Sequence, residues 1–377
     1  MKTAPWRVGV LFSKSGVTEI TETEHLQGTL LAIEEINAAG GVGGRLVEPV
    51  VYDPEADSAM YRHMARDLLA EEEVNVIFGC SMSASRKAVL PIMERHNGLL
   101  FYPSMYEGFE YSENVVYTGA TLNQNTFALA DFLLQSYGKR IYITGSDYIY
   151  PRESNRVMRD LIEAKGGEVV AETYLPIDAD PRATAGVIED IQRHEPDAIF
   201  STVIGRSARH FYTQYDAAGF DRHRNPIASL TMAETEIGAI GAERCDGHIL
   251  AATYMHTLKD EATRRFVSAF QQAYGPQATT SIWSQTAYLQ VHLFARALAR
   301  TGSTDAGKIS DAVLTETFAA PGDAVSFDAQ TRHLFLTPRL GVARRDGLFD
   351  IEWEASTPVR PDPYLVMTRF EETWLSA

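Results

Sequence analysis

The chain has 377 residues, of which 45% are hydrophobic and 22% charged, as in an ordinary globular protein. At roughly 150 residues per domain, this length predicts two or three domains. The formal net charge of −16 argues against a nucleic-acid-binding surface, which needs a basic stripe, although it does not exclude a protein partner that binds nucleic acid.

Strand and helix patterns alternate from the start of the chain. Segment 6–12 is apolar, as in a strand, and in 21–41 apolar residues recur at helical spacing until Gly40 and Gly41 end the helix. The same criteria predict strands at 45–53, 75–79 and 98–102, and helices at 58–72 and 85–97. This βαβα order with short connections indicates a parallel sheet covered by helices on both faces.

A second α/β unit follows, without a low-complexity linker. The expected helices are 125–138, 152–167, 184–195, 207–219, 261–275 and 281–300, and the expected strands are 140–145, 168–176, 197–203 and 248–254. Residues 334–355 predict a β-hairpin with its turn at 344–347. Helix 281–300 is apolar on much of its circumference, which indicates a buried core helix or, alternatively, a dimer contact.

The first residues lack the pattern of a signal peptide. MKTAPWRVGVLFSKSG enters a strand directly, with no separate apolar region and no small-residue cleavage site. No run of about 18 apolar residues predicts a membrane span. The two cysteines, Cys80 and Cys245, lie far apart in the sequence and are expected to be reduced, with a disulfide or a reactive thiol as the alternative. These features predict a cytoplasmic protein.

Parallel sheets of this kind bind ligands beyond the carboxyl ends of their strands. The loops that follow such ends are 13–16, 80–85, 103–111, 146–151 and 204–208. Two units that present these edges to each other would form a cleft. Candidate binding residues are therefore expected in these loops.

The loop residues are mainly small hydroxyls and tyrosines. Ser83 and Ser85 stand at a predicted helix start, where they could cap the helix or bind a ligand beside its free N–H groups. Tyr148 and Tyr150 stand just before the helix that Pro151 is expected to begin. With Tyr102 and Tyr106 they are either packing residues or the walls of a site for a small polar ligand.

Few charged residues accompany these loops: Arg86, Lys87, Glu107, Asp147 and Arg152. A zwitterion would need partners for both of its charges, because burying an unpaired charge costs several kcal/mol. The loop composition therefore favours a neutral, hydrogen-bonding ligand.

No pattern of catalytic or metal-binding residues stands out. AAGGVGGR, residues 38–45, follows a helix and precedes a strand, so we interpret it as a helix stop and turn, not a phosphate loop. The histidines have no metal-ligand spacing, and there is no G-x-S-x-G elbow. Asp147 near Ser83 is the one base–nucleophile pair that could be suggested. We expect no catalytic residue, no metal and no cofactor.

Longer motifs resemble a known family. EINAAGGVGGR is similar to the signature of Leu/Ile/Val-binding-like, type I periplasmic binding proteins. GCSMSASRKAVLPIMERHNGLLFYP, YEGFEYSENVVYTGA, GSDYIYPRESNRVMR, FSTVIG and PVRPDPYLV resemble, within that family, the amide-binding regulators of the AmiC type. The similarity covers nearly the whole chain, and urea receptors share parts of it.

The resemblance implies a two-lobed α/β fold, each lobe a mostly parallel sheet flanked by helices, with a ligand cleft between the lobes. It implies a cytoplasmic sensor, without enzyme activity, that binds a short-chain amide and sequesters an RNA-binding antiterminator until the amide arrives, so regulating an amidase operon negatively. The ligand residues it carries over are Ser83, Tyr102, Ser104, Tyr148, Tyr150 and Thr231. The alternative is a substrate-binding receptor of an ABC transporter for urea or short-chain amides.

Two departures from the family pattern affect the expected ligand. Ser81 stands where the pattern has an aromatic residue, and Ser104-Met105 stands where it has Thr-Pro. Losing a ring should enlarge the pocket, and methionine makes its wall adaptable. We therefore add Ser81, Met82 and Met105 to the candidate site, and expect a small neutral amide or urea-like ligand. A bulkier or differently polar amide fits these departures.

The resemblance also places three crossings between lobes, near 121, 251 and 328. The N-terminal lobe would then comprise 1–121 and 251–328, and the C-terminal lobe 122–250 and 329–377.

Overall fold

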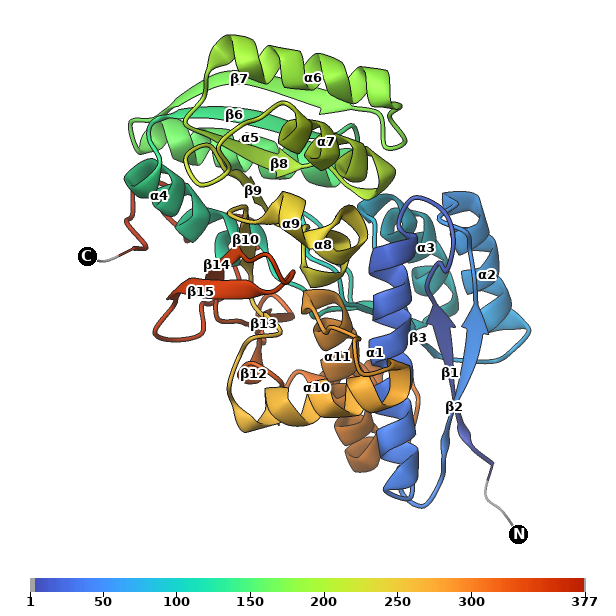
Figure 1. Cartoon of the computed structure of the whole chain (residues 1–377). Coiled ribbons are helices and arrows are strands. Elements are labelled where there is room, and N and C mark those ends of the chain that lie inside the picture. Colours follow the sequence, from blue (N-terminus) through green and yellow to red (C-terminus); the bar gives the residue numbers. More distant parts are fainter. Residues whose placement is uncertain (1–3, 376–377) are drawn as a thin grey trace. The chain divides into compact units, whose positions relative to one another are not determined.

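The computed structural model describes residues 4–375. They form two compact units, and each unit is built from two stretches of the chain (Figure 1). Unit 1 contains the residues up to Ala120 together with Leu258–Phe335, and unit 2 contains Thr121–Thr257 together with the residues from Leu336 onward. The chain therefore passes between units three times, after Ala120, after Thr257 and after Phe335.

Unit 1 contains an eight-stranded sheet with the order β11-β12-β13-β5-β4-β3-β1-β2. Its strands are β1 (Trp6–Leu11), β2 (Val47–Tyr52), β3 (Val76–Gly79), β4 (Leu99–Tyr102), β5 (Val115–Tyr117), β11 (Thr317–Ala319), β12 (Ala324–Asp328) and β13 (His333–Phe335). The five N-terminal strands are parallel, and β13 pairs in parallel with β5. Strand order reverses between β1 and β3, which is where such sheets bind ligands.

Two helix layers cover this sheet. The helices are α1 (Glu19–Ala38), α2 (Ser58–Ala70), α3 (Ser83–His96), α10 (Glu261–Tyr274), α11 (Ile282–Thr301) and α12 (Ala306–Val313). Figure 1 shows α1 with α11 on one face of the sheet and α2 with α3 on the other, in agreement with their mutual packing. Tyr61 and Leu68 of α2 and Val89 and Met93 of α3 are buried in the core on their face.

Unit 2 contains a seven-stranded sheet with the order β15-β14-β10-β9-β8-β6-β7. Its strands are β6 (Arg140–Ser146), β7 (Glu168–Leu175), β8 (Ala198–Thr202), β9 (Ile227–Ser229), β10 (Ile249–Ala252), β14 (Arg339–Ala343) and β15 (Phe349–Glu354). Its helices are α4 (Thr126–Ser136), α5 (Ile149–Ala164), α6 (Pro181–His194), α7 (Gly205–Ala217), α8 (Glu234–Ile240) and α9 (Ala242–Cys245), preceded by the 3-10 turn η1 (Leu122–Gln124). β6 to β10 are parallel, and β14 and β15 are antiparallel.

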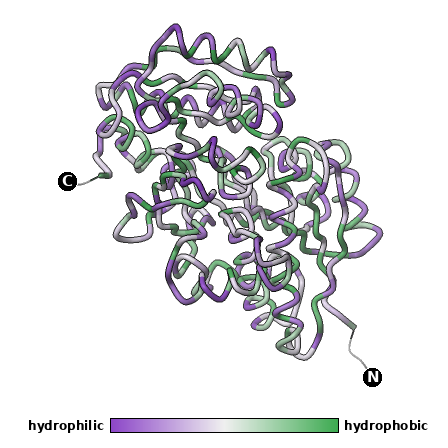
Figure 2. Tube along the Cα trace, viewed as in Figure 1, coloured by the Kyte–Doolittle hydropathy of each residue, from purple (hydrophilic) through white to green (hydrophobic). Residues whose placement is uncertain are grey.

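The burial pattern explains why these segments form these elements. In α6, Thr184, Val187, Ile188 and Ile191 are buried, and their spacing places them on one helix face. Figure 2 shows the corresponding alternation of hydrophobic and hydrophilic residues along this helix. The predicted mostly parallel α/β architecture with two sheets is confirmed.

Several boundaries differ from the sequence expectation. Residues 251–257 belong to unit 2 because β10 pairs with β9 and β14, and β13 belongs to unit 1 because it pairs with β5. The predicted hairpin at 334–355 is therefore shorter in the structure, where β14 and β15 form it from residues 339–354. α11 buries most of its residues within unit 1, which accounts for its apolar circumference.

Candidate ligand-binding site

Six of the nine predicted site residues lie together at one edge of the unit 1 sheet. Ser81 and Met82 follow β3, and Ser83 is the first residue of α3. Tyr102 ends β4, and Ser104 and Met105 follow it. β3 and β4 pair in parallel, so both loops leave the same edge of the sheet.

The chain turns sharply just before this cluster. Cys80 is fully buried and adopts a left-handed backbone conformation with φ 67°. Left-handed residues other than glycine are uncommon and cluster at binding sites, where the surrounding structure must stabilise them. The Cys80 amide donates to the Leu11 carbonyl of β1, which holds the turn in place.

Hydroxyl groups connect the two loops. Tyr102 donates its hydroxyl to the Ser81 carbonyl over 2.5 Å, and Ser104 Oγ donates to Ser81 Oγ over 3.1 Å. Ser104 is buried, whereas Ser81 is half-buried. The hydroxyl hydrogen of Ser81 therefore remains available as a donor at the rim of the cluster.

Ser83 does not cap α3. Met82 is the N-cap residue and makes no side-chain capping bond, while Ser83 Oγ donates to Glu107 Oε2 over 2.7 Å. Both residues are buried. The Ser83 oxygen can still accept a hydrogen bond, because its own hydrogen is already given to the carboxylate.

A buried ion network holds Glu107 in place. Arg86 is fully buried and donates to Glu107 Oε1 and Glu110 Oε1, both over 2.7 Å. Lys87 reaches the other oxygen of Glu110 over 2.8 Å. Burial by itself acts to raise the pKa of Glu110, but Arg86 and Lys87 outweigh this effect and lower it. Two cations thus balance two carboxylates.

Aromatic rings enclose this network. The Arg86 guanidinium carbon lies 4.8 Å from the Tyr102 ring centre and 4.7 Å from that of Tyr106. Tyr106 and His333 both stack on Tyr117, each with 4.5 Å between ring centres. Cation–π contacts of this kind gain strength when they are removed from water. The Tyr102 side chain therefore supports the site from within unit 1 rather than standing free in a loop.

The other three predicted site residues lie in unit 2. Tyr148 is the N-cap residue of α5, and Tyr150 lies inside the first turn of that helix, 4% exposed. The expectation that both precede the helix is therefore wrong for Tyr150, because α5 begins two residues before Pro151. Proline is tolerated there, since the N–H groups of a first turn have no partner within the helix.

Thr231 follows β9 at the corresponding edge of the unit 2 sheet. Its amide donates to Ser229 Oγ over 3.0 Å, and the two hydroxyls are 3.2 Å apart. Thr231 is 8% exposed. Tyr148 and Tyr150 at the start of α5, and Thr231 after β9, are therefore all positioned by elements of unit 2.

The suggested base–nucleophile pair has other partners. Asp147 lies exposed beside Arg152, 2.7 Å away, and Ser83 is bonded to Glu107. Within residues 4–375 no group of three or more histidine, cysteine, aspartate or glutamate side chains could hold a metal ion. In the same range no helix has the length and apolar character that a membrane crossing needs. Cys80 and Cys245 are both buried and free, and burial raises the pKa of each thiol.

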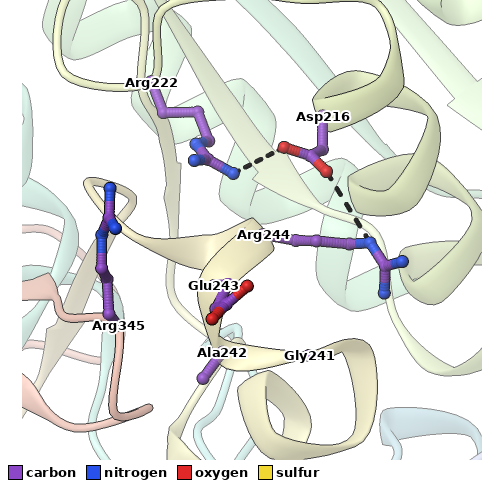
Figure 3. Close-up of a pocket in the computed structure, with 7 residues that line it drawn as sticks. All are labelled: Asp216, Arg222, Gly241, Ala242, Glu243, Arg244 and Arg345. Atoms are coloured by element: carbon purple, nitrogen blue, oxygen red, sulfur yellow. Dashed lines mark hydrogen bonds and ion pairs between the residues drawn. The ribbon is translucent and has the colours of Figure 1, made fainter.

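A separate hollow in unit 2 contains paired charges. It has a volume of about 560 Å³ and is lined by residues of α9 together with Asp216, Arg222 and Arg345 (Figure 3). Asp216 lies between Arg222, 2.6 Å away, and Arg244, 3.7 Å away, and Arg345 lies 3.3 Å from Asp246. Because its arginines are already matched by carboxylates, we assign it no binding role.

Sequence reasoning missed the support of the site. From the sequence, Arg86, Lys87 and Glu107 are no more than charges near the loops, and Glu110, Tyr117 and His333 are not among the predicted site residues. The available signal was the pair of carboxylates in YEGFEY, which follows the strand next to the one that SASRK follows. Opposite charges in loops after adjacent parallel strands are candidates for a buried ion pair.

Comparison with known proteins places the chain in a family. The family model described as "Periplasmic binding protein domain" matches residues 6–369, so the chain belongs to the periplasmic binding proteins. A relative named "Leu/Ile/Val-binding protein homolog 6", from Brucella melitensis, is 25% identical over 78% of this chain and 76% of its own length.

Solved structures agree on the fold. The branched-chain amino acid transporter substrate-binding protein LivJ from Streptococcus pneumoniae, in complex with isoleucine, has a TM-score of 0.83 at 21% identity, covering 95% of this chain and 100% of that one. A solute-binding protein of an ABC transporter from R. palustris, in complex with 4-hydroxybenzoate, has a TM-score of 0.86 at 23% identity, covering 97% and 100%.

These comparisons confirm the Leu/Ile/Val-binding-like, type I periplasmic-binding-protein assignment and its fold. The family is one of ligand-binding proteins. The narrower resemblance to amide-binding regulators stays a prediction.

Proposed function

We propose that the chain is a substrate-binding receptor that closes its two units around one small ligand, of the kind that serves an ABC transporter. The similar solved structures include proteins named for this role, and a relative is named as a Leu/Ile/Val-binding protein homolog. The ligand would contact the loops after β3 and β4 of unit 1 and those after β6 and β9 of unit 2. All nine predicted site residues lie in these loops or at the ends of the strands and helices that the loops join.

The Ser83–Glu107 hydrogen bond is the observation that favours a neutral ligand with an N–H group. The hydrogen of Ser83 is committed to Glu107, so Ser83 offers a ligand an acceptor. Ser81 receives the hydrogen of Ser104 and keeps its own to donate. An acceptor and a donor two residues apart match the NH₂ and C=O of a primary amide or urea.

The unit 1 part of the site offers no free cation of this network to a carboxylate ligand. The two cations of the network, Arg86 and Lys87, are matched by Glu107 and Glu110. An anion beside Ser83 would also approach the Glu107 carboxylate, and an unpaired buried charge is costly. The ligand is therefore proposed to be a short-chain amide or a urea-like molecule, although the similar solved structures are complexes with isoleucine and 4-hydroxybenzoate.

A ligand screen tests the function and the ligand class together. Thermal unfolding is measured with acetamide, propionamide, butyramide, urea, formamide, isoleucine and 4-hydroxybenzoate, followed by calorimetry on any hit. A ligand that binds only the folded chain stabilises it by about 2.7 kcal/mol at a hundredfold excess over Kd. Stabilisation by amides or urea supports the proposal. Stabilisation by isoleucine or 4-hydroxybenzoate alone would support the proposal of a substrate-binding receptor and contradict the proposal of a neutral ligand.

A matched pair of serine variants tests the site. Ser83→Ala removes the proposed acceptor and is expected to weaken the hit about tenfold. Ser85→Ala is the control, because Ser85 Oγ bonds the Met82 carbonyl in the same helix turn. Equal affinities in the two variants would place the ligand elsewhere.

A second function rests on the motifs shared with amide-binding regulators. In this alternative the chain is cytoplasmic, and ligand binding releases an antiterminator protein, so that the acidic net charge suits a basic, RNA-binding partner. Fractionation of the native cells separates the two functions. Neighbouring genes for an amidase and an antiterminator would favour the regulator, and genes for a permease and an ATPase would favour the receptor. Light scattering on the purified chain tests the alternative that was left open for helix 281–300, a homodimer contact.

A further inference from the structure

A groove lies between α2 and α3 of unit 1. Its volume is about 750 Å³. It is lined by Ser58, Ala59, Arg62, His63 and Arg66 of α2 and by Lys87, Ala88, Pro91, Ile92 and Arg95 of α3. In each helix the lining residues have the spacing i, i+1, i+4, i+5 and i+8, which places them on one face of the helix. Over eight residues this face extends about 12 Å along each helix.

The lining residues carry positive charge only. Four are arginine or lysine, one is histidine and none is acidic, although the whole chain has a net charge of −16. Arg66 is bonded to Asp67, and Lys87 to Glu110. Arg62 and Arg95 are exposed and form no ion pair with any residue that the structure describes. In this respect the groove differs from the hollow at α9, whose arginines have carboxylate partners.

Apolar residues lie among these cations. Ala88 and Ile92 are half-buried, and Ala59 and Pro91 are exposed. A surface between two helices that combines apolar residues with cations matches an amphipathic helix that carries acidic residues beside its apolar face. The charges are spread along both helices, which suits an extended polypeptide better than a single small anion.

We propose that the α2–α3 groove docks an acidic, amphipathic helical segment of a partner protein. Carboxylates of the segment pair with Arg62 and Arg95, and its apolar side chains cover Ala88 and Ile92. The rest of this acidic chain repels such a segment, so charge complementarity directs it to the groove. This proposal concerns a surface outside the candidate ligand site and does not depend on which small ligand binds.

A designed peptide supplies the probe. It has about fifteen residues, with glutamates on one helical face and leucines on the other, and carries a fluorescent label. Binding to the full chain is followed by fluorescence anisotropy at about 50 mM and about 300 mM salt. We expect binding that weakens with salt, and no binding of the same peptide with lysines in place of glutamates. Failure of the acidic peptide to bind would overturn the proposal.

Charge-reversal variants locate the interaction. Arg62→Glu with Arg95→Glu is expected to weaken binding at least tenfold. Arg182→Glu with Arg224→Glu, two exposed positions in unit 2, makes the same change in net charge and is expected to alter binding less than twofold. Equal effects of the two double variants would overturn the proposal, because binding would then follow net charge alone.

Two further measurements complete the test. A photo-crosslinking version of the peptide, applied to the unmodified chain, should label residues of α2 and α3, which keeps the test valid if a variant misfolds. Labels elsewhere would contradict the proposal. Inorganic tripolyphosphate is the probe for a small anion: if it binds with the same dependence on Arg62 and Arg95 and displaces the peptide at equal concentration, the groove is an anion site and the proposed partner is wrong.

Discussion

Gly28 of α1 lies against the backbone of Ser284 in α11, so closely that a Cβ atom at Gly28 would come within 2.2 Å of the Ser284 carbonyl oxygen. The obstacle is backbone, which cannot rotate away as a side chain can. Gly28→Ala must therefore push the two helices apart. We expect it to lower the free energy of unfolding by about 3 kcal/mol, measured by urea denaturation.

Gly186 provides the control for this prediction. It lies in α6, where an added Cβ meets no heavy atom within 4 Å. Alanine is the better helix former, so Gly186→Ala is expected to stabilise the chain by about 1 kcal/mol. The two substitutions should have opposite signs. A Gly28→Ala variant that is as stable as the unmodified chain, or more stable, would mean that α1 and α11 are not in such close contact.

Arg86→Met is expected to destabilise unit 1 strongly. It removes the cation between Glu107 and Glu110, which are 3% and 9% exposed, so that Glu107 loses its cation and Glu110 keeps only Lys87. Losing one partner of a buried ion pair costs about 3–5 kcal/mol. Lys87→Met serves as control, since Lys87 is 42% exposed and should cost less than about 1 kcal/mol. Similar losses in the two variants, measured by urea denaturation, would contradict the buried network.

The stability of unit 2 is expected to fall below pH 6.5 because of His248. The Ile227 amide donates to its Nδ1, and burial, with Arg222 and His223 nearby, lowers its pKa to about 3. Between these pH values the unfolded chain takes up a proton that the folded chain refuses, so unfolding becomes easier as pH falls.

His248→Asn tests this titration. Asparagine keeps an acceptor for Ile227 but binds no proton. Between pH 7.5 and 5.0 the unmodified chain should lose about 2 kcal/mol more than the variant. The exposed His96→Asn is the control and should behave like the unmodified chain. Parallel pH profiles for all three proteins would show that His248 takes up a proton when folded.

Glu22 of α1 is expected to act in the opposite direction. Its carboxylate accepts hydrogen bonds from the Ser13 amide, the Thr18 hydroxyl and the Tyr61 hydroxyl. Burial raises its pKa to about 7. The folded chain holds this proton more tightly than the unfolded one. The resulting stabilisation is complete below about pH 4.5 and is lost as pH rises through 7.

Glu22→Gln should remove this dependence. Relative to the variant, the unmodified chain should lose about 3 kcal/mol of stability between pH 5 and pH 8, measured by urea denaturation. Glu19→Gln, at an exposed position of the same helix, should leave the profile unchanged. A flat difference between the Glu22 variant and the unmodified chain would show that this carboxylate is ionised throughout.

The fold could be predicted from the sequence because its signals are local. Apolar runs and helical spacing located β1, α1 and most later elements. Short strands such as β5 and β11 were missed, because their three residues are defined only by pairing with distant strands. The pairing of β13 with β5 likewise depends on contacts between residues far apart in the chain.

The site could be predicted only in part for the same reason. Ser81, Ser83 and Ser104 were identified from their place after strands. That Ser83 bonds Glu107, and that Arg86 joins two carboxylates, depends on the pairing of β3 with β4. No periodicity in the sequence reports such contacts.

Lys87 is shared by the α2–α3 groove and the buried ion network, since it lines the groove and donates a hydrogen bond to Glu110. Glu110 is joined through Arg86 and Glu107 to Ser83. If an occupant of the groove draws Lys87 away from Glu110 and thereby changes the affinity at Ser83, thermodynamic reciprocity requires the ligand at Ser83 to change the affinity of the groove by the same factor. A tenfold effect in one direction, worth about 1.4 kcal/mol, implies a tenfold effect in the other.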